Sequence, residues 1–341
     1  MNHKDEPAGG SAAGRPVREE ATQTTPAPRR REAPPGRGAS PSRAWVLPLF
    51  LLAPSIAITL IFYVAPAVIT GAMGLTDMDY RLRWNFVGFR NYLDMLEDFL
   101  LPGVFWNTLV YTFATLALFN VGFALLLALA TTHVDERAGA FFRALWLLPR
   151  FSPPIVYGVI WLWILDPTRM GFLNSLWLAA GGSQPVNWIS QYPMPVIVVI
   201  NGVIGASFGM VIFYSAIRSI PRDYLWAAHV DGASWLQQVR YVTLPLIRWP
   251  LLFVTAYQTL SLLTSYEYIL IVTGGGPYFK TTVWALYAYN LAFGGYYAAY
   301  KFGYGAALAM ILVAVGIVAS VVYWRAFRFR RMMAEPRIEV T

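Results

Sequence analysis

The sequence predicts an all-α, polytopic membrane protein with six transmembrane helices, and two observations carry this prediction. Hydrophobic residues make up 57% of the 341 positions and charged residues only 13%, whereas a soluble domain carries about 25% charged residues. Apolar segments also recur at the length of roughly 20 residues that a helix needs to cross a bilayer. These segments are 45–73, 104–131, 141–165, 194–217, 247–272 and 303–326.

Prolines predict irregular geometry in two of these spans. The first span contains three prolines, and the third contains Pro149, Pro153 and Pro154. A proline inside a helix removes a backbone hydrogen bond, and its ring clashes with the carbonyl of the preceding turn. We therefore expect a kink in the first span and a break in the third.

Residues 1–43 differ in composition from the rest of the chain, being rich in Pro, Gly, Ala, Ser and Arg without an apolar period. Such a segment cannot bury enough surface to offset its ordering entropy, so we expect a disordered tail. The Arg29–Arg31 run has two interpretations, a twin-arginine export signal and a solvated tail that retains the N-terminus inside. The apolar run that starts at Ala44 is too long for a signal core, which favours the tail.

The positions of lysine and arginine predict the orientation, because cytoplasmic connections carry an excess of both. Most of the 26 basic residues lie in the N-terminal tail, between spans two and three, within and beside 220–245, or near the C-terminus. Both termini, including the tail 332–341, and the 220–245 segment are therefore expected in the cytoplasm. This asymmetry accounts for the net charge of +8 without a nucleic-acid partner.

The 220–245 segment is a polar island between the fourth and fifth spans with strong helix and turn signals. Ser219 can cap a helix whose first residue is Pro221, and the Asp-Gly pair at 231–232 favours a turn. Ser234 and Gln237 have the spacing of a capping box for a second short helix. We expect a helix, a turn and a helix at the cytoplasmic surface.

The spacing within this island resembles one family, the permease subunits of binding-protein-dependent ABC importers in the carbohydrate-uptake branch (maltose and glycerol-phosphate type inner-membrane components). These permeases carry Glu-Ala-Ala, three residues, Gly, nine residues, Ile, any residue and Leu-Pro. The matching positions are Trp226-Ala227-Ala228, Gly232, Val242 and Leu244-Pro245. Residues 85–92, 148–161 and 272–277 also resemble the family, which extends the similarity over about 45–330.

The resemblance implies a cytoplasmic coupling helix in this island that receives motion from an ATPase. The residues assigned to this coupling are Asp223, Trp226, Ala227, Ala228, Asp231, Gly232, Leu244 and Pro245. The family's opening Glu, which is expected to pair with a basic group on the ATPase, is Trp226 here. Asp223 lies on the same helix face three residues earlier and is the candidate replacement. A passive amphipathic loop is the alternative.

The resemblance also implies a substrate pathway on the fourth and fifth spans. The analogous positions are Asn201, Gly205, Phe208, Gln258, Ser261, Leu262 and Ser265. Polar residues inside a span are costly in hydrocarbon and are functional candidates, and hydroxyl partners and aromatic faces suit a sugar. The same side chains could instead hold the helices together, and the sequence leaves both interpretations open. For Glu267 we expect a structural partner, with Arg150 as the candidate.

Several kinds of chemistry are not expected of this chain. It has no cysteine, and its three histidines have no acidic or histidine companion at ligand spacing, so we expect no metal site. Residues 274–281 nearly match the phosphate-binding loop, but Phe279 stands where the second glycine is needed. We therefore expect no enzyme activity and no cofactor in this chain, with ATP and magnesium bound by a partner ATPase.

The resemblance implies a multi-pass protein of the cell inner membrane, with residues 44–331 as the permease domain. Its partners would be a second permease subunit in a heterodimer, two ATP-binding subunits, an extracytoplasmic solute-binding protein, membrane lipid and a sugar. A permease for another solute, such as glycerol phosphate, is an alternative. A secondary transporter would need intramembrane carboxylates or repeats, and a membrane glycosyltransferase would need paired acids.

Overall fold

The computed structural model describes residues 46–294 and 300–327, whose regular elements are helices joined by turns and loops, with one isolated bridge between Thr76 and Phe86. The chain divides into two units, Met1–Ile58 and Thr59–Thr341. In the first unit the described part belongs to helix α2 (Val46–Thr59). The predicted tails 1–43 and 332–341 lie outside the described residues.

Among the described residues, four helices are long and apolar enough to cross a membrane, and two bent helix pairs raise the number to six if each pair is one span. The four single helices are Phe50–Met73, Leu101–Thr132, Pro193–Arg218 and Phe302–Ala326. The two bent pairs are Glu136–Phe151 with Pro154–Ile164, and Trp235–Leu246 with Arg248–Leu263. Each of the six predicted segments is therefore mostly helical, and the predictions differ from the structure in where the helices begin and break.

The second unit begins with a π-helical turn, η1 (Leu60–Val64), followed by α3 (Ala65–Met73). The π turn ends two residues before Pro66. A single π turn lets a helix continue where the regular hydrogen-bond ladder is interrupted, so the helix passes its proline without a break. Residues 60–69 are exposed within this chain.

The next elements form a long hairpin of two spans. They are α4 (Arg90–Glu97), α5 (Leu101–Ala114), η2 (Thr115–Phe123), α6 (Ala124–Thr132), α7 (Glu136–Phe151) and α8 (Pro154–Ile164). Between α7 and α8 the axis turns by 104°, because Ser152 and Pro153 are extended, with ψ values of 139° and 142°. The expected break is confirmed, and the third span is two helices rather than one helix over 141–165.

Two short helices, α9 (Phe172–Ala179) and α10 (Trp188–Gln191), follow α8. Their connection is organised by Asn174, whose buried amide donates to three backbone carbonyls and accepts from the Val186 amide and the Trp188 indole. Just before α9, hydrogen bonds from the side chain and backbone of Thr168 lower the pKa of the Asp166 carboxyl. Side-chain hydrogen bonds therefore hold this loop, together with Leu173, Trp188 and Ile189, which pack on a neighbouring apolar cluster.

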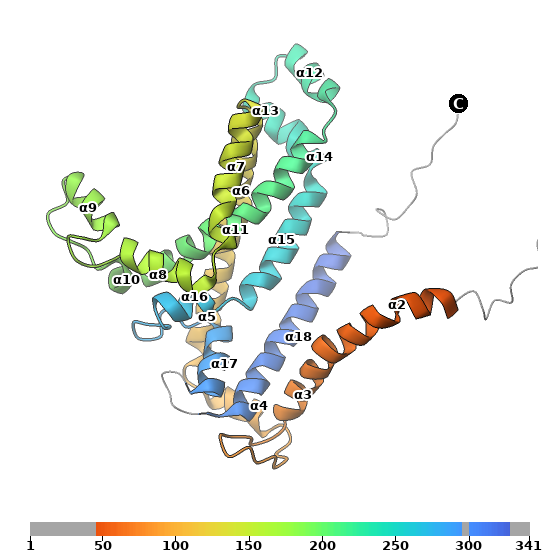
Figure 1. Cartoon of the computed structure of the whole chain (residues 1–341), viewed down its shortest axis with the longest axis vertical. Helices are drawn as coiled ribbons and strands as arrows, with labels where there is room; N and C mark the ends of the chain where they lie inside the picture. Colours follow the sequence, from red (N-terminus) through yellow and green to blue (C-terminus); the bar gives the residue numbers. More distant parts are fainter. Residues whose placement is uncertain (1–45, 295–299, 328–341) are drawn as a thin grey trace, which may run out of the picture. The chain divides into compact units, whose positions relative to one another are not determined.

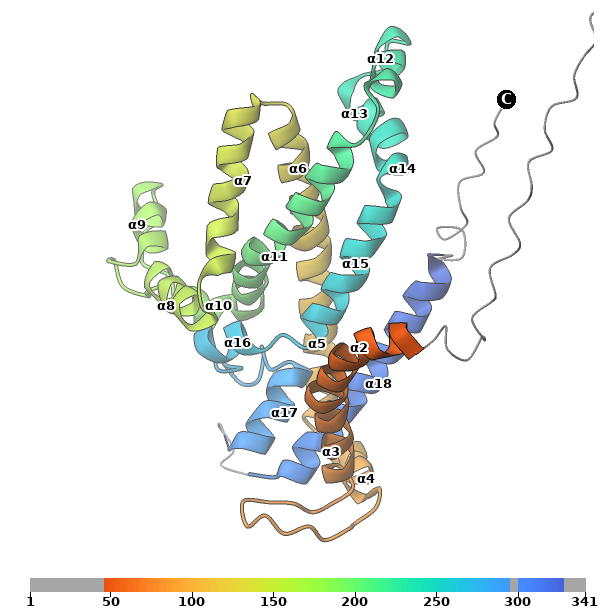
Figure 2. The same cartoon turned by 45° about the vertical axis from the view of Figure 1, so that its right-hand side comes forward.

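The second half of the unit is built around α11 (Pro193–Arg218), and Figures 1 and 2 show it next to α6 and α15. The remaining elements are α12 (Arg222–Val230), α13 (Trp235–Gln238), η3 (Val239–Thr243), α14 (Leu244–Leu246), α15 (Arg248–Leu263), α16 (Glu267–Val272), α17 (Trp284–Phe293) and α18 (Phe302–Ala326). Helix α11 packs against α6, η2, α7 and α15, while α17 packs on α18. The most buried of the long helices is therefore the predicted fourth span.

The predicted fifth span, 247–272, is not continuous. Helix α15 ends at Leu263, and a short non-helical connection leads into α16. The Thr264 hydroxyl donates to the carbonyls of Leu260 and Ser261, and such side-chain bonds compete with the helical ladder. The break brings the connection 264–266 beside α11, which is where the candidate site lies.

Candidate functional site

A cavity of about 390 Å³ lies where α11, α15, α16 and the end of α7 meet. Its lining residues are Arg150, Asn201, Ile204, Gly205, Gln258, Ser261, Leu262, Thr264, Ser265, Tyr266, Glu267 and Tyr268. Of the seven residues predicted to form the substrate pathway, all except Phe208 belong to this set. The structure thus brings most of the predicted pathway together around one space, and whether cargo occupies it stays a prediction.

Amide side chains in this cavity link neighbouring helices. The Asn201 Nδ2 donates to the Tyr111 hydroxyl and, over 2.9 Å, to the Ser265 Oγ. The Gln258 Nε2 donates to the Gly205 carbonyl of α11 over 3.0 Å. The structure therefore gives the amide nitrogens an interhelical role, which was one of the two interpretations left open.

The same amides each present a second polar atom. The Asn201 Oδ1 and Gln258 Oε1 accept no hydrogen bond from the described residues. Neither oxygen is fully buried. Both residues line the cavity. A carbonyl oxygen in this position can accept a hydrogen bond from a hydroxyl group, so each amide uses its nitrogen between helices and leaves its oxygen available at the cavity.

Arg150 and Glu267 bring charge to the cavity. The expected pairing between them is not formed, because neither is among the ion pairs within 4.0 Å in the described residues. The Arg150 guanidinium instead lies 5.4 Å from the centre of the Phe208 ring, which stacks on Tyr257 at 4.8 Å. Phe208 is not among the residues that line the cavity. Its ring contacts the Arg150 guanidinium by a cation–π interaction.

The 220–245 segment forms the predicted helix, turn and helix. Ser234 and Gln237 make the predicted capping box: the Gln237 amide donates to the Ser234 Oγ, and the Ser234 amide donates to the Gln237 Oε1 over 2.7 Å. Ser219 does not cap α12, because its hydroxyl donates to the Ala216 carbonyl of the last turn of α11. The helix starts at Arg222 with Pro221 as its N-cap, which corrects the prediction by one residue.

Gly232 ends α12 in a Schellman motif. Its φ is +77°, its amide donates to the His229 carbonyl over 3.0 Å, and the Ala233 amide donates to the Ala228 carbonyl over 2.9 Å. Glycine is favoured where the chain must turn in the left-handed region. The predicted Asp-Gly turn is therefore confirmed.

The residues predicted to couple to an ATPase are mostly exposed in this chain. Asp223, Trp226, Ala227, Asp231, Gly232 and Pro245 are exposed, whereas Ala228 and Leu244 are intermediate. In Figures 1 and 2, α12 and α13 lie at the same end of the second unit as the α6–α7 connection. Nothing in the chain tests the coupling role itself, which stays a prediction.

Side chains from the α6–α7 connection reach this segment. The Trp235 indole donates to the His133 Nε2 over 3.0 Å, and the two rings lie edge to face at 6.0 Å. The residues are 102 positions apart. A second cavity, of about 330 Å³, lies beside this contact between the end of α6, the end of α11, α12 and α13.

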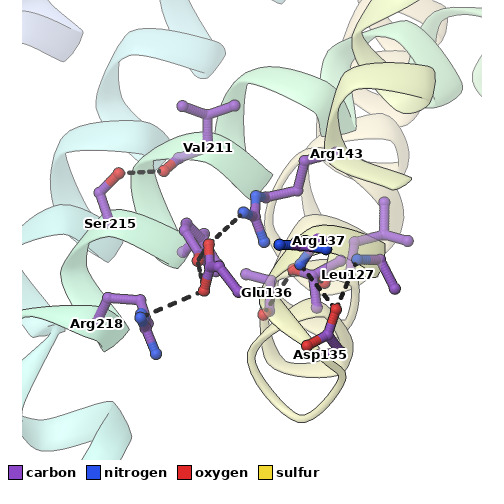
Figure 3. Close-up of polar contacts among 12 residues, drawn as sticks. Leu127, Asp135, Glu136, Arg137, Arg143, Val211, Ser215 and Arg218 are labelled. Carbon is purple, nitrogen blue, oxygen red and sulfur yellow. Dashed lines mark hydrogen bonds and ion pairs between the residues drawn. The ribbon is translucent and has the colours of Figure 1, made fainter. Parts of the chain in front are cut away.

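An ionic cluster at Glu136 joins the start of α7 to the end of α11, as Figure 3 shows. The Glu136 carboxylate lies 3.1 Å from the Arg143 guanidinium and 3.3 Å from that of Arg218, and it accepts a hydrogen bond of 2.9 Å from the Tyr214 hydroxyl. The Arg143 guanidinium also lies 3.6 Å from the centre of the Tyr214 ring. The cluster was not predicted from the sequence, although an acid at 136 lies just before the predicted third span, 141–165, and close to Arg137 and Arg143.

The family model described as "Binding-protein-dependent transport system inner membrane component" matches residues 120–332 of this chain. Among curated proteins, the sn-glycerol-3-phosphate transport system permease protein UgpA of Shigella flexneri is 30% identical over 285 residues, which cover 82% of this chain and 93% of the relative. The diacetylchitobiose uptake system permease protein NgcF of Streptomyces coelicolor is 28% identical and covers 85% and 86%. The trehalose/maltose transport system permease protein MalF of Thermococcus litoralis is 28% identical and covers 82% and 93%.

A solved structure has the same fold. A chain of a bacterial ABC transporter involved in the import of the acidic polysaccharide alginate superposes with a TM-score of 0.68 at 24% identity, covering 86% of this chain and 98% of that chain. The similarity extends over both the cavity-lining helices and the 220–245 segment, which lie within the matched residues of the family. This chain therefore belongs to the family of binding-protein-dependent transport system inner membrane components, the permeases of ABC importers.

Proposed function

We propose that this inner-membrane permease imports a sugar or oligosaccharide through the cavity between α11, α15 and α16. It would pair with a second permease subunit, sit on two ATP-binding subunits and receive its cargo from an extracytoplasmic solute-binding protein. Both termini and the 220–245 segment would face the cytoplasm, as the lysine and arginine positions indicate. ATP and magnesium would be bound by the ATP-binding subunits, and this chain would carry no cofactor.

The observation that carries the proposal is the chemistry of the cavity lining. Amides, hydroxyls and tyrosines converge there with one guanidinium and one carboxylate, from Arg150 and Glu267. A single positive and a single negative group leave the lining without a large net charge, and the other polar groups suit hydrogen bonds to hydroxyls. These features favour an uncharged polyhydroxyl cargo over a phosphate monoester, for which clustered basic groups are the usual solution.

The connectivity supports a coupling role for the 220–245 segment. Helix α11 leads into α12 through three residues, and α13 continues through η3 and α14 into α15. The segment is thus covalently continuous with both long helices that line the cavity. ATP binding would bring the two ATP-binding subunits together, and α12 would transmit that motion to α11 and α15. Such a device needs two states whose balance the partner shifts.

The test is uptake by the complete complex reconstituted in proteoliposomes with its solute-binding protein. We expect ATP-dependent uptake of a labelled disaccharide or oligosaccharide from a panel that also contains sn-glycerol 3-phosphate. Gln258→Leu should lower uptake at least about tenfold, because the variant removes the acceptor at Oε1 and the bond to the Gly205 carbonyl. Thr255→Ala, which changes another α15 residue outside the cavity lining, is the matched control.

Three outcomes would contradict the proposal. Transport of sn-glycerol 3-phosphate alone would establish the other solute class that was left open in the sequence analysis. Uptake driven by an ion gradient without ATP would identify a secondary transporter. Equal uptake by the Gln258→Leu and Thr255→Ala variants would remove the cavity from the transport pathway.

A further inference from the structure

The cavity beside the 220–245 segment is a built space with an unusual charge pattern. Its lining includes His133, Arg218, Arg222, Trp226 and Trp235, and no aspartate or glutamate is among its lining residues. Its volume is about 330 Å³, which is large enough for one or two side chains of a partner but small for a whole helix.

Two of its three basic side chains already have partners. Arg218 lies 3.3 Å from the Glu136 carboxylate. The His133 Nδ1 lies 2.8 Å from the Leu129 carbonyl, and its Nε2 accepts from the Trp235 indole. Both ring nitrogens of His133 are thus occupied by contacts within this chain.

Arg222 is the basic side chain of this lining that has no partner within the described residues. It is exposed, and within the described residues it makes no ion pair and no side-chain hydrogen bond. It occupies the first turn of α12, where the helix dipole adds positive potential. Asp223 follows it in sequence but does not line the cavity, so the lining carries an unpaired positive charge at Arg222.

Two indole rings form the walls of this positive space. Trp226 is 61% exposed and Trp235 is 49% exposed, although both are large apolar side chains outside the apolar spans. Trp226 lies four residues after Arg222, so the two share a helix face. Tryptophan and arginine are the residues that most often dominate the energy of protein interfaces.

We propose that this cavity is a socket for an acidic segment of the ATP-binding subunit, with a carboxylate of that subunit on Arg222 and an adjoining apolar side chain between Trp226 and Trp235. The inference rests on the proposed function and adds the chemistry of the partner surface. A basic group from the partner would meet Arg222 with no carboxylate in the lining, and like charges facing each other at an interface are unfavourable. An acidic group of the ATP-binding subunit would instead meet the opposite charge of Arg222.

The test measures binding of the ATP-binding subunit that copurifies with the native complex. The two permease subunits are placed in lipid nanodiscs, and the dissociation constant is measured without nucleotide for the original chain and for Arg222→Glu and Trp226→Glu. We expect both variants to weaken binding at least about tenfold, as for interface residues of this kind. Arg240→Glu is the matched control, because Arg240 is exposed on the same segment but outside the socket, and it should change binding less than about twofold.

A second readout separates charge from misfolding. Arg222→Lys keeps the charge and should retain most of the binding, whereas Arg222→Gln should weaken it and flatten its dependence on salt, since exposed ion pairs are screened. Tighter or unchanged binding by Trp226→Glu overturns the inference and points to a basic partner surface. Equal effects of Arg222→Glu and Arg240→Glu also overturn it. Failure of the ATP-binding subunit to bind the original chain would overturn the proposed function itself.

Discussion

The tight packing of α11 on the second span leads to a sharp prediction at Gly209. A Cβ at this position would lie 2.5 Å from the Asn120 carbonyl oxygen and 2.8 Å from the Ala124 Cβ. Real Cβ atoms do not approach other heavy atoms this closely. Because one of the two colliding atoms belongs to the backbone of η2, a rotamer change cannot relieve the contact.

The expected cost follows from that geometry. Gly209→Ala forces the buried helices apart, and overpacking of this kind typically costs about 1–3 kcal/mol. Replacement of glycine by alanine in a helix by itself favours folding by about 1 kcal/mol, so the net destabilisation is about 0–2 kcal/mol. Gly103 in α5 is the matched control, since a Cβ there has nothing within 4 Å. Gly103→Ala keeps the gain in helix propensity without the collision.

The assay is thermal unfolding of the two variants in the same detergent, followed by intrinsic tryptophan fluorescence. We expect the midpoint of Gly209→Ala to lie several degrees below that of Gly103→Ala, and Gly103→Ala to lie at or above the original chain. The comparison between variants removes the propensity effect common to both. A midpoint for Gly209→Ala equal to or above that of Gly103→Ala would refute the close approach of α11 and η2.

Three further predictions concern the 220–245 segment and the ionic cluster at Glu136. Gly232→Pro should abolish ATP-driven uptake by vesicles while immunoblots show normal insertion, because proline cannot adopt φ +77° or donate to the His229 carbonyl; normal uptake would contradict a coupling role. Trp235→Phe should lower the ATPase rate stimulated by cargo, and an unchanged rate would exclude the His133 contact from coupling. Glu136→Gln should lower uptake less at high salt than at low salt, measured in the same vesicles; a loss independent of salt would argue against its ion pairs.

The local features of the chain were predictable because the residues that determine them are neighbours in sequence. Apolar length alone located the helical spans, since a segment that crosses the bilayer must satisfy its own backbone hydrogen bonds by forming a helix. The Ser234–Gln237 capping box and the turn at Gly232 involve hydrogen bonds across three to five residues. The proline pair at 153–154 likewise predicted the break between α7 and α8, because neither proline has a backbone N–H to donate to the preceding turn.

The site was predictable only in part. The resemblance placed Asn201 and Gln258 on the pathway, and the structure places both on one cavity. It did not place Arg150 there, because that position depends on the 104° turn after α7. Ser219 was assigned to the wrong helix end, since a hydroxyl between two helices can serve either one and the carbonyl of Ala216 was nearer.

By itself, the sequence determined the number of apolar segments, their approximate limits, the helix–turn–helix between the fourth and fifth, and the family that these features resemble. Only the tertiary structure decided where the fifth span breaks, which atom of each cavity amide is used between helices, and that Glu136 and His133 meet α11 and α13. The physical reason is that local patterns set backbone hydrogen bonds within a few residues. Contacts across 78 to 102 positions depend on the angles at which whole helices pack, and no short pattern encodes those angles.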